Sequence, residues 1–454
     1  MSIIVVGAGE IGYHVAKRLS QEKKDVIVID ADPEKVERVR ETLDVEGIVA
    51  SGSSPGALEN ARIKEADMLI AVTDSDEVNM VSCLVAHAQS KTTTKIARIR
   101  NLEYLYDPDI LKKSNLSIDL IINPGYEAVS SLINLLQVPG ATDIVDFNDG
   151  AVKLIGCTVH NALFHKGIQL TELHEKSGIH DLVVVSICRN GKVIIPRGSD
   201  KILYRDAIYA VTGQNRIGDM MRFFGQESRD IKRAMIVGGG SVGLLLARAL
   251  EKMKIACRLV EQDETRCAQL AEQLDKTVVL HHPDDIEVLI SEEHLAGIDL
   301  FAAVTEDEED NIIWSLLAKQ KGVGKAVALI NNMTYTQLIS RIGVDFVVNP
   351  NLAAINRILH FIRRGKVLSV ASFYETNTEA IEAVALETSD IVNTPLKNLR
   401  LPEHAIIGAI VRNGALIVPK GDSVILPNDH VIIFALTSQI PKIEKLLTVK
   451  VDYW

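Results

Sequence analysis

Residues 4–12 read Ile-Val-Val-Gly-Ala-Gly-Glu-Ile-Gly, and residues 235–243 read Met-Ile-Val-Gly-Gly-Gly-Ser-Val-Gly. Each stretch is an apolar run that leads into the pattern Gly-x-Gly-x-x-Gly. A continuous apolar run is typical of a strand buried on both faces of a parallel sheet. The three glycines permit a tight turn, a close approach to a pyrophosphate and close packing of a helix on the sheet. Both stretches therefore predict the strand, loop and helix start of a dinucleotide-binding unit.

An acidic residue follows each loop at the same spacing, Asp30 in the first copy and Glu261 in the second. A carboxylate about 20 residues beyond such a loop accepts hydrogen bonds from the ribose hydroxyls of NAD. Ala31 and Asp32 supply no arginine for a 2′-phosphate, so NAD is favoured over NADP. The alternative is that the glycines serve only helix–sheet packing, and it applies more strongly to the second copy.

The similarity extends along the chain, which is therefore two copies of one unit of about 225 residues. Each copy begins with alternating apolar strands and amphipathic helices, which predicts α/β architecture with a doubly wound parallel sheet, a Rossmann-type lobe. Each copy ends in short strands with an Asn-Gly or similar hairpin turn, which predicts a small α+β lobe. The expected lobes are residues 1–138, 139–225, 231–365 and 366–450.

Polar residues end the predicted fourth strand of each copy: Thr73 and Asp74 in the first, Thr305 and Glu306 in the second. Carboxyl ends of strands face the ligand crevice in such sheets, so these residues are predicted to border the nicotinamide ribose. A helix cap is the alternative for Thr73. The acidic run 306–310 is interpreted as a solvated helix start rather than a cation site.

Arg98 and Arg100 are predicted at the end of the fifth strand, where an arginine would clamp a phosphate or a neighbouring subunit. A solvated strand end is the alternative for Arg98. The second copy has Leu329 and Asn331 at the matching positions. The two sites therefore differ, and they are expected to differ in nucleotide preference or in affinity.

Composition excludes several classes of protein. The chain has 454 residues with 49 Lys and Arg against 60 Asp and Glu, a net charge of −11, which argues against a general nucleic-acid binder. No apolar stretch reaches the roughly 20 residues of a membrane helix. We therefore expect a cytoplasmic protein that reaches a membrane only through a partner.

The motifs for chemistry are incomplete. A dehydrogenase requires an acid or base near the nicotinamide, but no histidine with a flanking carboxylate recurs between the copies. No Cys/His set has zinc spacing. We therefore predict no catalytic and no metal-binding residues. Two nucleotide sites without catalytic groups favour a sensor, in which binding energy biases a conformation that a partner reads.

These motifs, with residues 71–79, 96–100 and the hairpin at 409–419, resemble the TrkA family over essentially the full length. Members of this family are cytosolic regulatory subunits of Trk potassium uptake systems and carry tandem RCK (regulator of K⁺ conductance) units. The resemblance implies binding of NAD or NADH and, in some members, ATP or ADP. It also implies a homotetramer whose ring of RCK units lies beneath a membrane channel of the TrkH or KtrB type and controls potassium flux.

The resemblance assigns nucleotide contacts to residues of both copies. They are Gly7, Ala8, Gly9, Glu10, Ile11, Gly12, Asp30, Thr73, Asp74 and Arg98 in the first copy, and Gly238, Gly239, Gly240, Ser241, Val242, Glu261, Thr305 and Glu306 in the second. Leu329 puts strong phosphate binding by the second site in doubt. Two other functions stay open: an RCK-type regulator of another cation transporter or antiporter, and an NAD-dependent oxidoreductase.

Overall fold

A computed structural model describes residues 1–106, 117–148, 150–226, 230–281, 297–332, 342–362, 367–373 and 377–447, together with residues 295 and 335. The chain forms two compact units, each assembled from both halves of the sequence. The first comprises Met1–Ser130 and Ile231–Leu359, and the second comprises Ser131–Asp230 and His360–Trp454.

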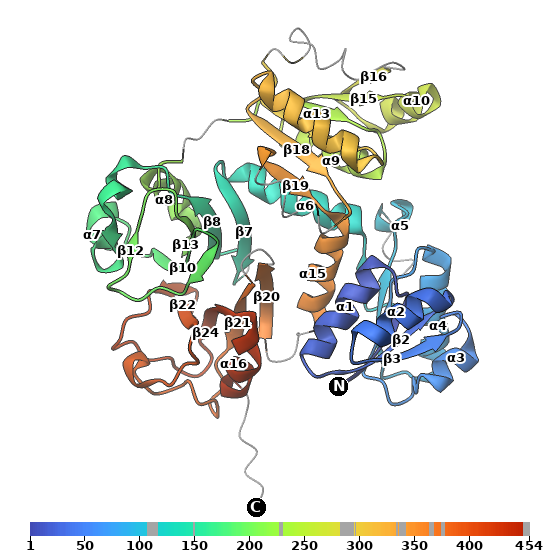
Figure 1. The fold of residues 1–454 in the computed structure, drawn as a ribbon, viewed down its shortest axis with the longest axis horizontal. Coiled ribbons are helices and arrows are strands. Elements are labelled where there is room, and N and C mark those ends of the chain that lie inside the picture. Colours follow the sequence, from blue (N-terminus) through green and yellow to red (C-terminus); the bar gives the residue numbers. More distant parts are fainter. Residues whose placement is uncertain are drawn as a thin grey trace, which may run out of the picture. The chain divides into compact units, whose positions relative to one another are not determined.

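The first unit contains two parallel sheets, and in the described residues each has six strands (Figure 1). Their orders, β3-β2-β1-β4-β5-β6 and β16-β15-β14-β17-β18-β19, are the same order along the two copies. The strands of the first sheet are β1 Ser2–Val6, β2 Asp25–Asp30, β3 Glu46–Val49, β4 Met68–Ala71, β5 Thr94–Arg98 and β6 Leu120–Ile122. Those of the second are β14 Arg233–Val237, β15 Ala256–Glu261, β16 Val278–His281, β17 Leu300–Ala303, β18 Lys325–Leu329 and β19 Phe346–Val348.

Helices connect these strands, so the predicted doubly wound α/β lobes are confirmed. β1 and β14 are fully buried after their first residue, as their apolar sequences predict. The helices of the first copy are α1 Glu10–Gln21, α2 Pro33–Thr42, α3 Pro55–Asn60, α4 Asp76–Gln89, α5 Glu103–Tyr106 and α6 Pro124–Gln137. Those of the second are α9 Ser241–Lys252, α10 Glu264–Gln273, α13 Glu308–Gln320 and α15 Pro350–Ile362.

The second unit contains two antiparallel sheets, one from each copy. Their orders, β11-β10-β13-β8-β7 and β23-β22-β24-β21-β20, again match strand for strand. The first sheet consists of β7 Ala141–Phe147, β8 Val152–Thr158, β10 Val183–Arg189, β11 Lys192–Ile194 and β13 Ala207–Gly213. The second consists of β20 Val367–Phe373, β21 Thr378–Val384, β22 Ala405–Arg412, β23 Ala415–Ile417 and β24 His430–Leu436.

Short helices complete these lobes, together with a small two-stranded ladder in the first of them, β9 Ile168–Gln169 with β12 Lys201–Ile202. The helices are α7 Leu173–Ser177, α8 Ile217–Phe223 and α16 Ile440–Leu447. The predicted hairpin is present: Arg189 pairs with Lys192, and both turn residues between them have positive φ. Asn190 and Gly191 supply that left-handed backbone at low cost, which fixes the register of β10 on β11.

One buried ion pair recurs in both small lobes. Arg189 donates from Nε and Nη2 to the two carboxylate oxygens of Asp206 at 2.8 and 2.7 Å, and Arg412 donates in the same way to Asp429 at 2.9 and 2.7 Å. Both aspartates are 2 % exposed. Each also accepts a backbone N–H from the tight turn before its strand. The pair therefore fastens the end of the hairpin to the neighbouring strand in each lobe.

The two small lobes share one hydrophobic core within the second unit. Tyr209 of the first lobe lies 4.6 Å from Phe373 and 5.9 Å from Phe434 of the second, measured between ring centroids. Phe147 and Val185 belong to the same cluster. The backbone N–H of residue 148 donates across the contact to the carboxylate of Glu382 at 3.2 Å. The lobes are therefore packed as a pair rather than as separate domains.

Replacing Asp429 with asparagine is expected to lower the free energy of unfolding by about 2–3 kcal/mol, because a charged, bidentate partner of a buried site is lost. Urea unfolding of the full-length protein, followed by circular dichroism, measures this change. The matched control is Asp422→Asn, which removes the carboxylate of the exposed Lys397–Asp422 pair and is expected to change stability by less than about 1 kcal/mol.

The difference between wild type and Asp429→Asn is also expected to depend on pH. Burial raises the pKa of Asp429, but hydrogen bonds from Arg412 and the Leu426 N–H outweigh it, so the pKa lies below the usual value. A lowered folded-state pKa contributes stability above the unfolded value of about 3.9 and loses it as pH falls through the folded value. Equal stability of the two proteins at pH 7 would contradict the structural role given to this pair.

Candidate nucleotide-binding site

The first glycine loop joins β1 to α1 and is shaped by its own glycines. Gly7 has φ +104°, and a Cβ there would lie 2.9 Å from the backbone nitrogen of Thr73. A Cβ on Gly12 would lie 1.8 Å from the carbonyl oxygen of Gly7. By contrast, nothing lies within 4 Å of the Cβ position of Gly9. Gly7 and Gly12 are therefore required by packing, whereas Gly9 faces open space, as a residue approached by a ligand would.

The second loop, between β14 and α9, repeats this geometry. Gly238 has φ +108°, a Cβ on Gly243 would lie 1.9 Å from the Gly238 oxygen, and Gly240 again has nothing within 4 Å. Gly9 and Gly240 are the N-caps of α1 and α9, and neither helix has a side-chain cap. The N–H groups of a helix's first turn have no partner within the helix, and together with its dipole they favour an anion at that end.

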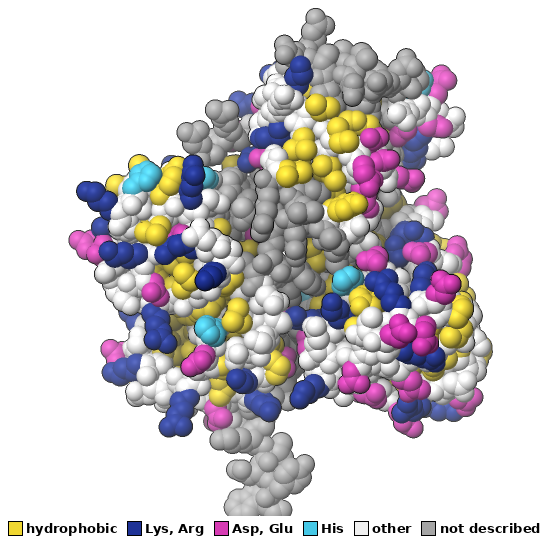
Figure 2. All heavy atoms as spheres, in the orientation of Figure 1, with side chains coloured by type: hydrophobic (Ala, Val, Ile, Leu, Met, Phe, Trp, Pro, Cys, Tyr) yellow, Lys and Arg dark blue, Asp and Glu magenta, His cyan; other side chains and the backbone are white. Residues whose placement is uncertain are grey.

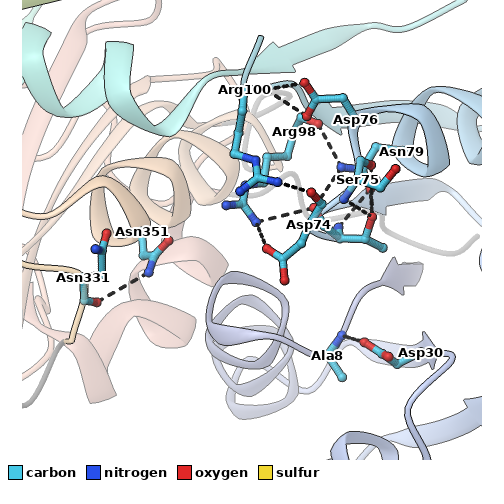
Figure 3. A network of polar contacts seen from close by, with 11 residues as sticks. Ala8, Asp30, Asp74, Ser75, Asp76, Asn79, Arg98, Arg100, Asn331 and Asn351 are labelled. Atoms are coloured by element: carbon cyan, nitrogen blue, oxygen red, sulfur yellow. Dashed lines mark hydrogen bonds and ion pairs between the residues drawn. The ribbon is translucent and has the colours of Figure 1, made fainter. Parts of the chain in front are cut away.

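The acids at matching positions of the two copies lie against these loops, at the ends of β2 and β15. Asp30 accepts the N–H of Ala8 at 2.6 Å (Figure 3). It also accepts the N–H of Asp32 at 2.9 Å. Glu261 accepts the N–H of Gly239 at 2.7 Å and that of Asp263 at 2.9 Å. Each carboxylate thus fixes its loop, and its remaining lone pairs are those a ribose diol would use.

The longer acid of the second loop explains the extra glycine there. A Cβ on Gly239 would lie 2.7 Å from Oε2 of Glu261 and 2.5 Å from Cδ1 of Leu270. Ala8 occupies the matching position beside the shorter Asp30. The pairs Ala8–Asp30 and Gly239–Glu261 are therefore two solutions to the same contact.

An asparagine network holds the end of the fourth strand in each copy. Asn79 is fully buried; its amide oxygen accepts the Thr73 N–H at 2.9 Å, and its Nδ2 donates to the carbonyls of Thr73 and Arg98. Asn311 makes the same set with Thr305 and Leu329. This network ties β4 to β5 and β17 to β18 where the strands meet the crevice.

The helix-cap alternative for Thr73 is wrong, because Ser75 is the N-cap of α4 and accepts the N–H of Val78 at 3.1 Å. Asp307 caps α13 in the same way, which confirms that the acidic run begins a helix. The hydroxyl of Thr73 lies 2.8 Å from Asn79 Oδ1, inside the network. Its backbone, rather than its hydroxyl, therefore borders Gly7.

Arg98 is not a solvated strand end. Its side chain is 12 % exposed and pairs through Nη1 with Asp74 Oδ1 at 3.0 Å (Figure 3). Burial, and next the positive charge of Arg100, lower the pKa of Arg98, and the Asp74 carboxylate opposes them. Its Nε is buried and has no hydrogen-bond partner among the residues that the structure describes. The guanidinium is therefore held at the crevice edge with a donor still unused.

Arg100 and Asp76 complete this edge of the first site. Arg100 donates from Nη2 to the carbonyl of Asp74, and its backbone N–H donates to Asp76 at 2.9 Å (Figure 3). At the matching positions of the second copy, Leu329 is 7 % exposed and Asn331 accepts on its backbone oxygen from Asn349 at 3.4 Å. The second edge has acids but neither of the two arginines.

One residue of the second site was missed by sequence reasoning. Arg266 of α10 donates from Nε to the carbonyl of Gly239 at 2.9 Å and from Nη1 to Gln269 at 3.1 Å, so its guanidinium lies on the second glycine loop. Lys35, the matching residue of the first copy, is exposed. The two positions directly after Glu261 are Gln262 and Asp263, and Arg266 follows only five residues beyond the acid, on α10, so no arginine adjacent to the acid points to it.

The remaining predicted contacts lie where the loops place them. Glu10 and Ile11 form the first turn of α1, with Ile11 buried, and Ser241 and Val242 form that of α9, with Val242 buried. Asp74 and Glu306 are exposed at the ends of β4 and β17. Within the described residues, no group of three or more His, Cys, Asp or Glu is placed to hold a metal ion.

Comparison with known proteins supports the family resemblance and the fold of both copies. The TrkA-N domain family matches residues 3–124 and 234–350, and the TrkA-C domain family matches residues 380–448. The chain is 38% identical to the Trk system potassium uptake protein TrkA of Azorhizobium caulinodans, over 100% of both chains. It is 35% identical to that of Halomonas elongata, again over 100% of both, and 33% identical to a TrkA homolog of Methanosarcina mazei over 98% of this chain and 100% of the relative.

Two solved structures share the fold. The GsuK channel bound to NAD superposes with a TM-score of 0.60 at 15% identity, covering 98% of this chain and 78% of that chain. The GsuK RCK domain gives a TM-score of 0.59 at 15% identity, covering 98% and 94%.

The glycines of the first loop are expected to separate folding from binding. Gly12→Ala places a methyl group 1.8 Å from a backbone oxygen, so it should destabilise the lobe by about 1–3 kcal/mol or more. Gly9→Val adds a side chain into open space, so it should leave the unfolding midpoint nearly unchanged. Thermal unfolding of both variants and of wild type measures the contrast. A Gly9→Val protein as unstable as Gly12→Ala would contradict the assignment of Gly9 to ligand binding rather than to packing.

Proposed function

We infer the function from one premise: the chain belongs to the TrkA family of Trk system potassium uptake proteins. We propose that it is a nucleotide-sensing regulatory subunit that gates a membrane potassium uptake channel of the TrkH or KtrB type. The observation that carries the proposal is the duplicated site, a glycine loop with an open Gly9 or Gly240 and an acid fixed beside it.

NAD or NADH is the proposed ligand, with ATP or ADP as further candidates. Asp30 and Glu261 would bind the adenosine ribose, the first turns of α1 and α9 the pyrophosphate, and the Thr73 and Thr305 strand ends would border the second ribose. The remaining contacts proposed are the loop residues of both copies, with Asp74, Arg98 and Glu306. A solved structure that shares this fold is described as the GsuK channel bound to NAD, which supports this class of ligand.

The role is regulatory and not catalytic in this proposal. The names of the relatives describe potassium uptake, and the candidate site offers donors, acceptors and a helix terminus rather than a positioned acid–base pair. Nucleotide binding would favour one arrangement of the chain over another, and the membrane partner would respond to that change.

In this proposal the protein is a homotetramer and binds no nucleic acid. Its channel partner holds it at the cytoplasmic face of the membrane. No helix in the described ranges is long and apolar enough to span a bilayer. Val81 and Leu84 on α4, and the matching Ile313 on α13, are 42 %, 44 % and 51 % exposed. Figure 2 shows hydrophobic side chains gathered around α13. Exposed apolar side chains at matching positions support self-association.

Four lobes are proposed as the working domains: 1–138 and 231–365 for nucleotide binding, 139–225 and 366–450 for the paired small lobes. Matching sheet orders within each pair support this division.

Calorimetric titration of NADH, NAD⁺ and ATP into the full-length protein is expected to show saturable binding at two sites. Gly9→Val should abolish the first and Gly240→Val the second, because each side chain would occupy the space of the ligand phosphates. Loss of all binding with Gly9→Val alone would make the second lobe structural. No binding of any nucleotide to wild type would end the sensor proposal.

Potassium-limited growth tests the partner. In a host without redundant uptake systems, deletion of the gene should impair growth at low potassium. The wild-type protein should restore nucleotide-responsive uptake, whereas a protein that carries both Gly9→Val and Gly240→Val should not. Unchanged growth after deletion would contradict a role in potassium uptake.

A further inference from the structure

We propose that the two nucleotide sites differ in their preference for the charge state of the nicotinamide ring. The affinity for NADH relative to NAD⁺ is higher at the first site than at the second. The inference rests on the proposed function and adds the ligand form to each site. The observation is that the crevice edges of the two copies differ by two arginines while their backbones are held alike.

The position of the nicotinamide half follows from the sheet order. β2, with Asp30, lies on one side of β1, and β4 and β5 lie on the other. Adenosine ribose binds the acid and the pyrophosphate lies at the α1 terminus, so the second half of a dinucleotide extends over β4 and β5. The groups that face it are therefore those that follow Ala71 and end at Arg98, and the equivalent groups in the second copy.

The first edge carries two arginines with two acids. Arg98 pairs with Asp74, which is 78 % exposed, while Arg100 and Asp76 lie alongside (Figure 3). Because Arg98 is largely buried, its guanidinium charge acts through a medium less polar than water, whereas Arg100 is exposed. The two arginines offset the charges of the two acids at this edge, so the cationic oxidised ring gains little there over the neutral reduced ring.

The second edge keeps the acids and loses both arginines. Glu306 and Glu308 stand where Asp74 and Asp76 stand, and Glu308 accepts the N–H of Asn332 at 3.2 Å, as Asp76 accepts that of Asn101. Leu329 and Asn331 contribute no charge. A cationic ring gains from this negative edge, whereas a neutral ring does not.

The two forms of the coenzyme are a matched probe, because they differ by one charge at the ring. Dissociation constants for NADH and NAD⁺ would be measured at the first site in Gly240→Val protein and at the second in Gly9→Val protein. The ratio of the two constants is expected to differ between the sites by about fivefold or more, in low-salt buffer where surface charges are least screened.

Exchanging the deciding residues tests the cause. Arg98→Leu should move the ratio of the NADH and NAD⁺ dissociation constants at the first site toward that of the second. Leu329→Arg or Asn331→Arg should move the ratio at the second site toward that of the first. Asn331→Arg is included because Leu329 is buried. Arg62→Leu, which removes an exposed arginine of the first lobe paired with Glu46, should leave the ratio unchanged.

The outcomes separate the two proposals. Binding at both sites with equal ratios, or ratios that ignore the exchanges, would overturn the charge inference and leave the sensor proposal intact. Absence of binding at both sites in wild type would overturn both. A shift with Arg62→Leu as large as with Arg98→Leu would also overturn the inference, because it would assign the effect to net charge.

Discussion

The contact between Gly12 and the carbonyl oxygen of Gly7 is the constraint on which each nucleotide-binding lobe depends. A methyl group at Gly12 would lie 1.8 Å from that oxygen, and at Gly243 1.9 Å from the oxygen of Gly238. The absence of a side chain lets the helix start against the strand end, which brings its N-terminus to the carboxyl edge of the sheet. The acid, the asparagine network and the arginine edge are all arranged around a loop that this approach fixes.

The two copies share the contacts that shape the backbone and differ in side chains at the crevice edge. The networks of Asn79 and Asn311 match bond for bond, and so do the Arg189–Asp206 and Arg412–Asp429 pairs. Differences fall at the crevice, where Arg98 becomes Leu329 and an exposed lysine becomes Arg266 on the loop. The scaffold and the side chains of the crevice edge are therefore separate sets of residues, so the edge differs between the copies while the fold stays the same.

The sequence predicted what depends on local spacing. Glycine spacing placed both loops, the acids after them and the turns at Asn190–Gly191, because each of these is specified by a few neighbouring residues. It assigned no residues to β3 and did not predict β7, since β3 has only four residues, and Asp143 and Asp146 interrupt the apolar pattern of β7. The burial of Arg98 and the placement of Arg266 on Gly239 also depend on residues that only the folded sheet brings together. No local sequence pattern therefore predicts them.

The paired small lobes give the duplication a mechanical consequence. β10 and β22 each carry a register shift, at Val185 and at Gly408, and a Cβ on Gly408 would lie 2.9 Å from Cγ1 of Val185. Matching positions of the two copies therefore meet, as in an isologous contact between subunits. Tyr209, Phe373 and Phe434 close the same core, so a displacement of one small lobe must repack the other or carry it along. Each half of the chain ends in a lobe that belongs to this core, so the two halves of the chain share one packed element rather than ending in two independent ones.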